Sequence, residues 1–170
     1  MPEAQVDRFM MKVLVDYPSP TEEFVIVERA ILPPPASQPV VDLGQLAELQ
    51  AQVLRVYVDP ALIEYSVALA NATRRPDEIG LAKLTRYVTF GASPRASINL
   101  ALAARALAFI RGRDYALPRD LTDLVLDVFR HRLVLSYEAL TDDVTADAVL
   151  AQVMAALPVP DVVPARRARP

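Results

Sequence analysis

Arg95 has the strongest chemical signal in this sequence. It follows Ser93-Pro94, a cap-then-proline pair that starts a helix, so it falls in the first helical turn. The helix macrodipole disfavours a positive charge there by about 0.3–1 kcal/mol. The same turn exposes backbone N–H groups, and a guanidinium beside them favours an oxyanion, phosphate above all. The position predicts a phosphate contact; the alternative is that Arg95 pairs with an acidic side chain or points into water.

Residue types exclude several other kinds of site. The chain has no cysteine, so it forms no disulfide and carries no thiolate metal site or thiol nucleophile. Its only lysines, Lys12 and Lys83, do not follow glycines, so no P-loop is present and the chain alone is not expected to hydrolyse a nucleotide. We expect the sole histidine, His131, at the surface or a helix end, and we expect Asp142 and Asp143 to be solvated turn residues rather than catalytic acids.

Composition favours a mainly helical protein. Of the 170 residues, 53% are hydrophobic but only 6% are aromatic and none is Trp, so the core must be built from Leu, Val, Ile and Ala. A net charge of −3 gives no general attraction to nucleic acid or anionic membranes. The N-terminus lacks the apolar core of a signal peptide, and no apolar run approaches the length of a membrane span. We therefore expect a cytoplasmic protein with no nucleic-acid partner and no membrane span.

Cap residues and apolar spacing predict about six helices that would position Arg95. Ser19 with Glu22 and Asp42 with Gln45 have capping-box spacing, and Asp59-Pro60 repeats the signal of Ser93-Pro94. The predicted helices cover residues 19–32, 42–57, 59–73, 93–110, 119–130 and 146–157. Gly112 is the expected C-terminal stop of the helix that carries Arg95.

Three segments do not fit this helical pattern. The apolar run Phe9–Val15 is typical of a buried strand, yet no run of comparable quality is available to pair with it. Residues 74–90 contain Pro76, Gly80 and mixed charges, which predicts a long loop with a brief extended TRYVTF segment. The proline-rich residues 33–41 predict a linker, and residues 159–170 a disordered tail.

Two stretches resemble the second half of MoxR-type AAA+ ATPases. They are PEAQVDRFMMKVLVDYPSPTEE, and GASPRASINLALAARALAFIRGRDYALPRDL together with VFRHRLVLS. The match runs in register over nearly the whole chain, and the order and spacing of its short motifs make the signal strong. A complete MoxR protein carries a P-loop, an acidic Mg²⁺ pair and a polar sensor before this region, and these are missing here. The chain thus resembles a C-terminal fragment or the product of a late start.

The resemblance implies roles for particular residues. It makes Arg8, in the Q-x-D-R-F motif, an arginine finger that reaches the nucleotide of a neighbouring subunit; the alternative is a salt bridge that caps the core. It makes Arg95 the sensor-2 residue on the terminal phosphate, with Pro94 beside it in the nucleotide contact. ATP and Mg²⁺ would be bound in the intact protein and not by this chain alone. Arginines presented to a transferring phosphoryl group raise rates by about 10³–10⁵ in other systems.

The resemblance also implies a domain organisation and a function. Residues 1–32 would be a strand-and-helix remnant of an α/β P-loop core, 33–41 the linker, 42–158 a helical AAA+ lid domain and 159–170 the tail. Phe9–Val15 would be the last strand of the core sheet. The intact protein would be an ATPase, a hexameric ring whose lid packs on the N-terminal P-loop core of the same protein. It would drive chaperone-like remodelling or activation of partners, with von Willebrand A domain proteins as candidates. The alternative is a stand-alone helical adaptor without ATPase activity.

Overall fold

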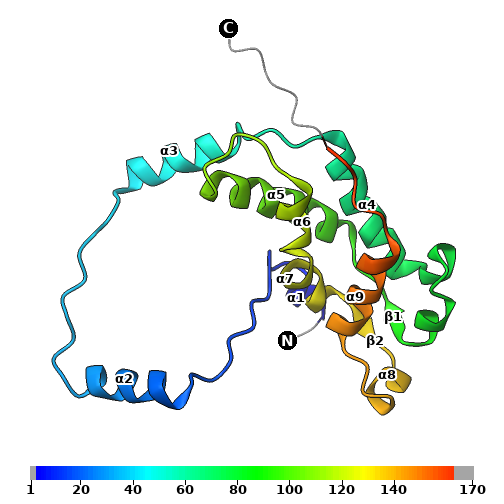
Figure 1. Ribbon diagram of the computed structural model, residues 1–170, viewed down its shortest axis with the longest axis horizontal. Coiled ribbons are helices and arrows are strands. Elements are labelled where there is room, and N and C mark those ends of the chain that lie inside the picture. The colour runs from blue at the N-terminus through cyan, green and yellow to red at the C-terminus, as the bar shows by residue number, and fades with distance from the viewer. Residues whose placement is uncertain (1–2, 163–170) are drawn as a thin grey trace, which may run out of the picture.

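The computed structural model describes residues 3–162 and shows a helical body from which one long segment loops away (Figure 1). The first half contains α1 (Glu3–Val6), α2 (Pro20–Ala30), α3 (Leu43–Val53), α4 (Pro60–Arg74), η1 (Pro76–Ile79), η2 (Ala82–Arg86) and β1 (Val88–Phe90). The second half contains α5 (Pro94–Ile110), α6 (Pro118–Thr122), α7 (Val125–Phe129), η3 (Arg130–Arg132), β2 (Val134–Leu135), α8 (Tyr137–Thr141) and α9 (Ala146–Ala156). The predicted mainly helical class is confirmed. None of the described helices has the length and apolar character to cross a membrane.

The body is built around the contact between α4 and α5. Alanines on both helices are fully buried, among them Ala70 of α4 and Ala104 of α5, and such small side chains let two helices approach closely. Larger aliphatic side chains from α4, α5, α6 and α9 fill the space around this contact, with Phe129 of α7 as the one fully buried aromatic ring among the described residues. The aliphatic core expected from the composition is therefore present.

The predicted helix starts are confirmed at the level of individual hydrogen bonds. Ser19 forms a reciprocal capping box with Glu22, and Asp42 forms another with Gln45. Ser93 accepts a hydrogen bond from the Arg95 backbone N–H at 3.3 Å, so Arg95 lies in the first turn of α5 as expected. These caps are formed by residues within a few positions of each other, which is why the sequence alone indicates them.

The region between α4 and α5 is more ordered than predicted. Residues 74–90 were expected to be a loop, but they contain two 3-10 turns, and only β1 corresponds to the expected extended segment. β1 pairs antiparallel with β2, where Val88 faces Leu135. β2 was not predicted, because a two-residue strand is defined by its partner and not by its own residue pattern.

The helix predicted for residues 119–130 is divided in two, which corrects that prediction. Asp123 and Leu124 separate α6 from α7, and Leu124, with a φ of −109° and a ψ of −7°, departs from regular α-helical values. The break turns α7 so that Val125, Val128 and Phe129 are all buried in the core. The free energy gained by burying these three side chains outweighs the cost of interrupting the helix.

The segment that loops away, residues 12–50, is called the arm here. Nearly every residue of the arm is exposed, and neither α2 nor α3 buries a single residue (Figure 1). Phe9–Val15 forms no strand, contrary to the prediction, because a strand needs a partner and none of the described residues supplies one. Its first half is nevertheless attached to the body: side chains of η3 contact the Phe9, Met10 and Lys12 carbonyls, and the Lys12 N–H donates to the Asp127 carbonyl at 2.8 Å.

Asp120 is a fully buried carboxylate that ties the end of α5 to α6. Its two oxygens accept hydrogen bonds of 2.6–2.8 Å from Arg111, Arg113 and the Leu117 backbone N–H. Burial raises the pKa of Asp120, but the hydrogen bonds from Arg113, Leu117 and Arg111 outweigh it and hold the pKa below its ordinary value. The carboxylate is therefore charged at neutral pH, with all of its charge compensated inside the body.

Asp120→Asn should destabilise the body strongly. The substitution preserves shape but leaves two arginines without their buried counter-charge, and breaking such a pair costs about 3 kcal/mol. A lower midpoint of urea unfolding would show this. Asp123→Asn is the matched control, because Asp123 also pairs with Arg111 but is partly exposed, and it should cost less than about 1 kcal/mol. Equal effects of the two substitutions would contradict this account.

Candidate functional site

Arg95 lies at the N-terminal end of α5, on a turn held by close backbone packing. A Cβ on Gly91 would lie 2.5 Å from the Thr73 carbonyl oxygen, so only glycine allows this approach to the end of α4. The Thr73 hydroxyl accepts a hydrogen bond from the Ala92 N–H at 2.9 Å and donates one to the Ala70 carbonyl at 2.7 Å. The Gly-Ala-Ser-Pro-Arg turn is thereby fixed on α4, and it presents the Arg95 side chain at the surface.

The carboxylate of Asp7 meets Arg95 at this point. The Arg95 Nη1 donates to Asp7 Oδ2 at 2.9 Å, and the Ser93 hydroxyl donates to the same carboxylate at 3.0 and 3.1 Å. The alternative that the sequence left open for Arg95, a pair with an acid of the same chain, is therefore realised among the described residues. The Arg95 side chain is nevertheless 55% exposed, so most of its five N–H donors remain accessible.

Arg132, which the sequence did not single out, completes this cluster. Its side chain is fully buried, and its Nε donates to Asp7 Oδ1 at 3.2 Å. Burial by itself raises the pKa of Asp7. Hydrogen bonds from Arg95 and Ser93 and the charges of both arginines together lower it by more, so the pKa lies below its ordinary value. Asp7 is therefore an anion held between two guanidinium groups.

Arg8 follows Asp7 directly in the sequence. Its side chain is exposed and makes no ion pair with any residue from 5 to 162. The core-capping salt bridge considered as the alternative is thus not seen within that range. Arg8 is the next residue after Asp7, which contacts Arg95, so the backbone of Arg8 is near the start of α5.

Pro94 and His131 are the two other residues near this cluster that the sequence analysis named. Pro94 is exposed at the first position of α5, where its missing N–H costs no hydrogen bond. The His131 Nε2 lies 3.1 Å from the Phe9 carbonyl oxygen, which requires a donating Nε2–H, while Nδ1 is buried without a partner. Burial lowers the pKa of His131 more than this hydrogen bond raises it, so the ring is neutral at pH 7. Asp7, Ser93, His131 and Arg132 line a shallow hollow of about 480 Å³.

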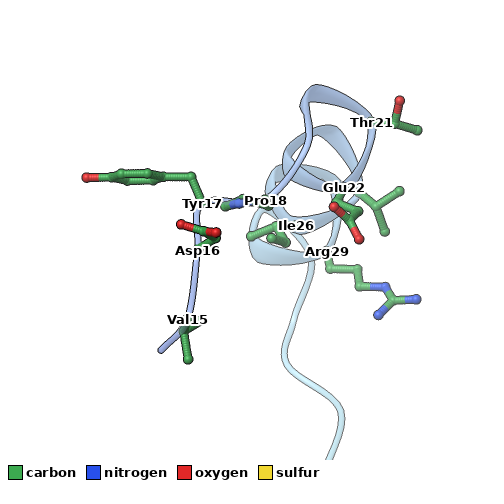
Figure 2. Close-up of a pocket in the computed structure, with 9 residues that line it drawn as sticks. Val15, Asp16, Tyr17, Pro18, Thr21, Glu22, Ile26 and Arg29 are labelled. Atoms are coloured by element: carbon green, nitrogen blue, oxygen red, sulfur yellow. The ribbon is translucent and has the colours of Figure 1, made fainter. Parts of the chain in front are cut away.

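A second hollow, of about 700 Å³, lies in the arm between residues 15–18 and α2 (Figure 2). Figure 2 shows Tyr17 pointing away from the helix, so its ring does not close the hollow. Glu22 on the rim is already used in the capping box with Ser19, which lowers its pKa. Asp16, Thr21 and Arg29 also line the hollow. Among the described residues, no group of three or more His, Cys, Asp or Glu side chains is arranged to hold a metal ion.

The chain matches known proteins over nearly its whole length. A family model described as an AAA lid domain matches residues 84–153. Chaperone MoxR1 of Mycobacterium tuberculosis is 43% identical over 95% of this chain and 43% of its own length, and Protein MoxR of Paracoccus denitrificans is 32% identical over 94% of this chain and 51% of its own. The crystal structure of a candidate ATPase from Cytophaga hutchinsonii is similar with a TM-score of 0.90 and 33% identity, over 95% of this chain and 49% of that one. The chain thus spans about half the length of the proteins it matches.

Gly91→Ala should destabilise the body and loosen the turn before Arg95. The new methyl group would meet backbone atoms of Thr73 and Arg74 at 2.5–2.6 Å, which cannot yield as a flexible side chain would. Overpacking of this kind costs about 1–3 kcal/mol, measurable by urea unfolding. Gly44→Ala is the control: its Cβ would meet only the Asp42 side chain, and α3 buries no residue, so the change should stay within about 0.5 kcal/mol.

The contact between Asp7 and the body should be lost in acid. Because the folded-state pKa of Asp7 is depressed, the stability it contributes is present above the unfolded value of about 3.9 and is lost as pH falls through the folded pKa. NMR titration of the carboxyl carbon should show this depressed pKa. Arg95→Ala should raise it towards the ordinary value, while Arg86→Ala, which removes contacts with Asp142 and Tyr87 but no hydrogen bond or ion pair with Asp7, should leave it unchanged. An unshifted Asp7 in both variants would contradict the assignment.

Proposed function

We propose that the chain is the C-terminal, lid-bearing portion of a MoxR-type AAA+ ATPase, and that it works as the lid of a ring that couples ATP hydrolysis to chaperone-like remodelling of partner proteins. The observation that carries the proposal is the presentation of Arg95 on the first turn of α5, in contact with Asp7, the residue that precedes the exposed Arg8. The name of Chaperone MoxR1 supports the chaperone-like role, and the candidate ATPase of similar fold supports the hydrolysis.

The exposed arm supports a partner core within the same protein. Apolar side chains of α2, such as Phe24, Val27 and Ile31, are more than half exposed, although burying each would contribute about 1.5–3 kcal/mol. The matched relatives are about twice as long as this chain, so they have further residues that such a surface could contact. We assign residues 1–32 to an α/β P-loop core completed by N-terminal residues of the same protein, with Phe9–Val15 joining its sheet, residues 33–41 to a linker and residues 42–158 to the lid domain.

ATP and Mg²⁺ belong to the proposed complete site, and the chain's residues fit one part of it. The accessible donors of Arg95 at a helix N-terminus suit the terminal phosphate, as a sensor-2 residue would require, with Pro94 at the adjoining helical position. ATP supplies the phosphoryl group that is transferred when it is bound. The phosphate-cradling loop and the Mg²⁺ ligands are assigned to the core, because the described residues offer neither.

Arg8 is assigned as the arginine finger of a homo-oligomeric ring, with six subunits as the expected number. An exposed guanidinium with no acid partner in residues 5–162 is available to a nucleotide on a neighbouring subunit, where it would stabilise the charge that develops on the phosphoryl oxygens. Von Willebrand A domain proteins are candidate partners of the ring on the basis of the family resemblance alone.

A stand-alone helical adaptor is the second candidate function. The same exposed apolar surface of the arm favours it, because that surface could bind another protein as readily as an ATPase core. The two functions differ in one respect: only the lid of a motor needs Arg8 and Arg95 to be placed for a phosphate.

Mixing this chain with a P-loop half that lacks its own finger and lid tests the proposal. We expect no ATP hydrolysis by the chain alone and recovered hydrolysis in the mixture. Arg95→Ala should lower turnover in the mixture by about 100-fold, the usual loss when one donor to developing charge is removed, while the free energy of unfolding falls by no more than about 1 kcal/mol, because the pair with Asp7 is partly exposed. Arg119→Ala is the control, because Arg119 is an exposed lid arginine that pairs only weakly with Asp123. Unaltered turnover in Arg95→Ala would remove Arg95 from the site, and no recovery in the mixture would favour the adaptor.

A further inference from the structure

The buried guanidinium of Arg132 donates most of its hydrogen bonds to backbone carbonyl oxygens around Arg8. Its Nη2 donates to the carbonyl oxygens of Asp7, at 3.1 Å, and of Phe9, and its Nη1 donates to that of Met10 at 3.3 Å. These are the carbonyls on either side of Arg8. Apart from the Asp7 carboxylate, the remaining partner of Arg132 is the Val128 carbonyl on its own side of the contact.

A second arginine, Arg130, extends this attachment from Met10 to Lys12. Arg130 donates to the Lys12 carbonyl at 2.8 Å, and the Lys12 N–H donates to the Asp127 carbonyl at 2.8 Å. Arg130 also pairs with Asp147 at 3.0 Å, so it is fixed to α9. The backbone from Asp7 to Lys12 is thus hydrogen-bonded to α7 and η3 along its length, even though it forms no strand there.

Asp7 connects this attachment to Arg95. One of its oxygens accepts from Arg132 at 3.2 Å and the other from Arg95 at 2.9 Å. The two arginines come from different elements, η3 and the first turn of α5, and each is held by the packed body. A displacement of Arg95 relative to the body would therefore act on the backbone of the residue next to Arg8 through two charged contacts.

We propose that Arg132 is a positioning residue for the arginine finger: it fixes the backbone of Arg8 on the lid and, through Asp7, links the position of Arg8 to that of Arg95. This inference rests on the proposed function of Arg8 and Arg95. Arg132 touches no substrate in this arrangement. Its role is to set where the exposed Arg8 side chain starts from, and a misplacement of about 1 Å at such a group can cost about 100-fold in rate.

The chemistry of Arg132 suits positioning better than core stability. Removing a full charge from water is costly, and an apolar residue of similar volume commonly packs at least as well in a core. A planar guanidinium has five N–H donors in a rigid fork, which lets one side chain hold several carbonyl oxygens in a fixed arrangement. Lysine has the same charge but lacks this fork, so Arg132→Lys separates geometry from charge.

The first experiment measures the position of Arg8 in the chain itself. The sequence has no cysteine, so spin labels on Arg8→Cys and Arg119→Cys report one distance without background. We expect a narrow distance distribution in the parent chain and a distribution at least about twice as wide in Arg132→Lys and Arg132→Met. Arg111→Met is the control, because Arg111 pairs with Asp120 and Asp123 and touches no residue of 7–12. An unchanged distribution in Arg132→Met would overturn the proposal.

The second experiment measures kinetics in the mixture with the P-loop half. We expect Arg132→Lys to lower kcat by about 100-fold with KM nearly unchanged, because a displaced finger alters the transition state and not nucleotide binding. Combining it with Arg8→Ala should give no further loss, whereas a loss of general stability would add to that of Arg8→Ala. Two outcomes would overturn the positioning role of Arg132 without affecting the finger assignment of Arg8. One is additive losses in the double variant; the other is full activity of Arg132→Lys when Arg8→Ala is inactive. An active Arg8→Ala would overturn the finger assignment of Arg8, and with it the positioning role of Arg132. The spin-label distances would still test whether Arg132 fixes the backbone of Arg8.

Discussion

The carboxylate of Asp7, held between Arg95 and Arg132, is the interaction on which the candidate site depends. It joins three parts of the chain that are far apart in sequence: the segment after α1, the first turn of α5 and η3. One of its arginine partners is half exposed and the other fully buried, so the charge cluster lies at the boundary between body and solvent. Without Asp7 the buried charge of Arg132 would lack a counter-ion, and Arg95 would lack its connection to the residues around Arg8.

The body can maintain this contact because its own core fixes both arginines. Arg95 is placed by the cap at Ser93 and by the close approach of Gly91 to α4, while Arg132 follows the buried residues Val128 and Phe129 of α7. Close packing of this kind transmits displacement instead of absorbing it. The arm has no such support, since α2 and α3 bury nothing. The rigid part of the chain is therefore the part that presents the arginines.

Sequence reasoning succeeded where the determining contacts are local and failed where they are not. The starts of α2, α4 and α5 were predicted because a cap involves residues two or three positions apart. The position of Arg95 at a helix start followed from the same rule. Asp7 and Arg132 belong to the quoted motifs Q-x-D-R-F and VFRHRLVLS, but their pairing was missed because the contact spans 125 residues. Phe9–Val15 was read as a strand from its apolar run, but its backbone pairing depends on a neighbour that the described residues do not provide.

The pairing of Arg95 with Asp7 is compatible with a phosphate contact, and the geometry explains why. A guanidinium has five N–H donors, and Asp7 uses one of those on Arg95. Asp7 also keeps hydrogen bonds from Ser93 and Arg132 that do not depend on Arg95. A phosphate could therefore share Arg95 with Asp7, or replace Asp7 there while the carboxylate stays attached to Arg132. In the second case the link between Arg95 and the segment around Arg8 would be present without nucleotide and weakened when nucleotide is bound. Binding of phosphate at Arg95 would then change how firmly the segment around Arg8 is held.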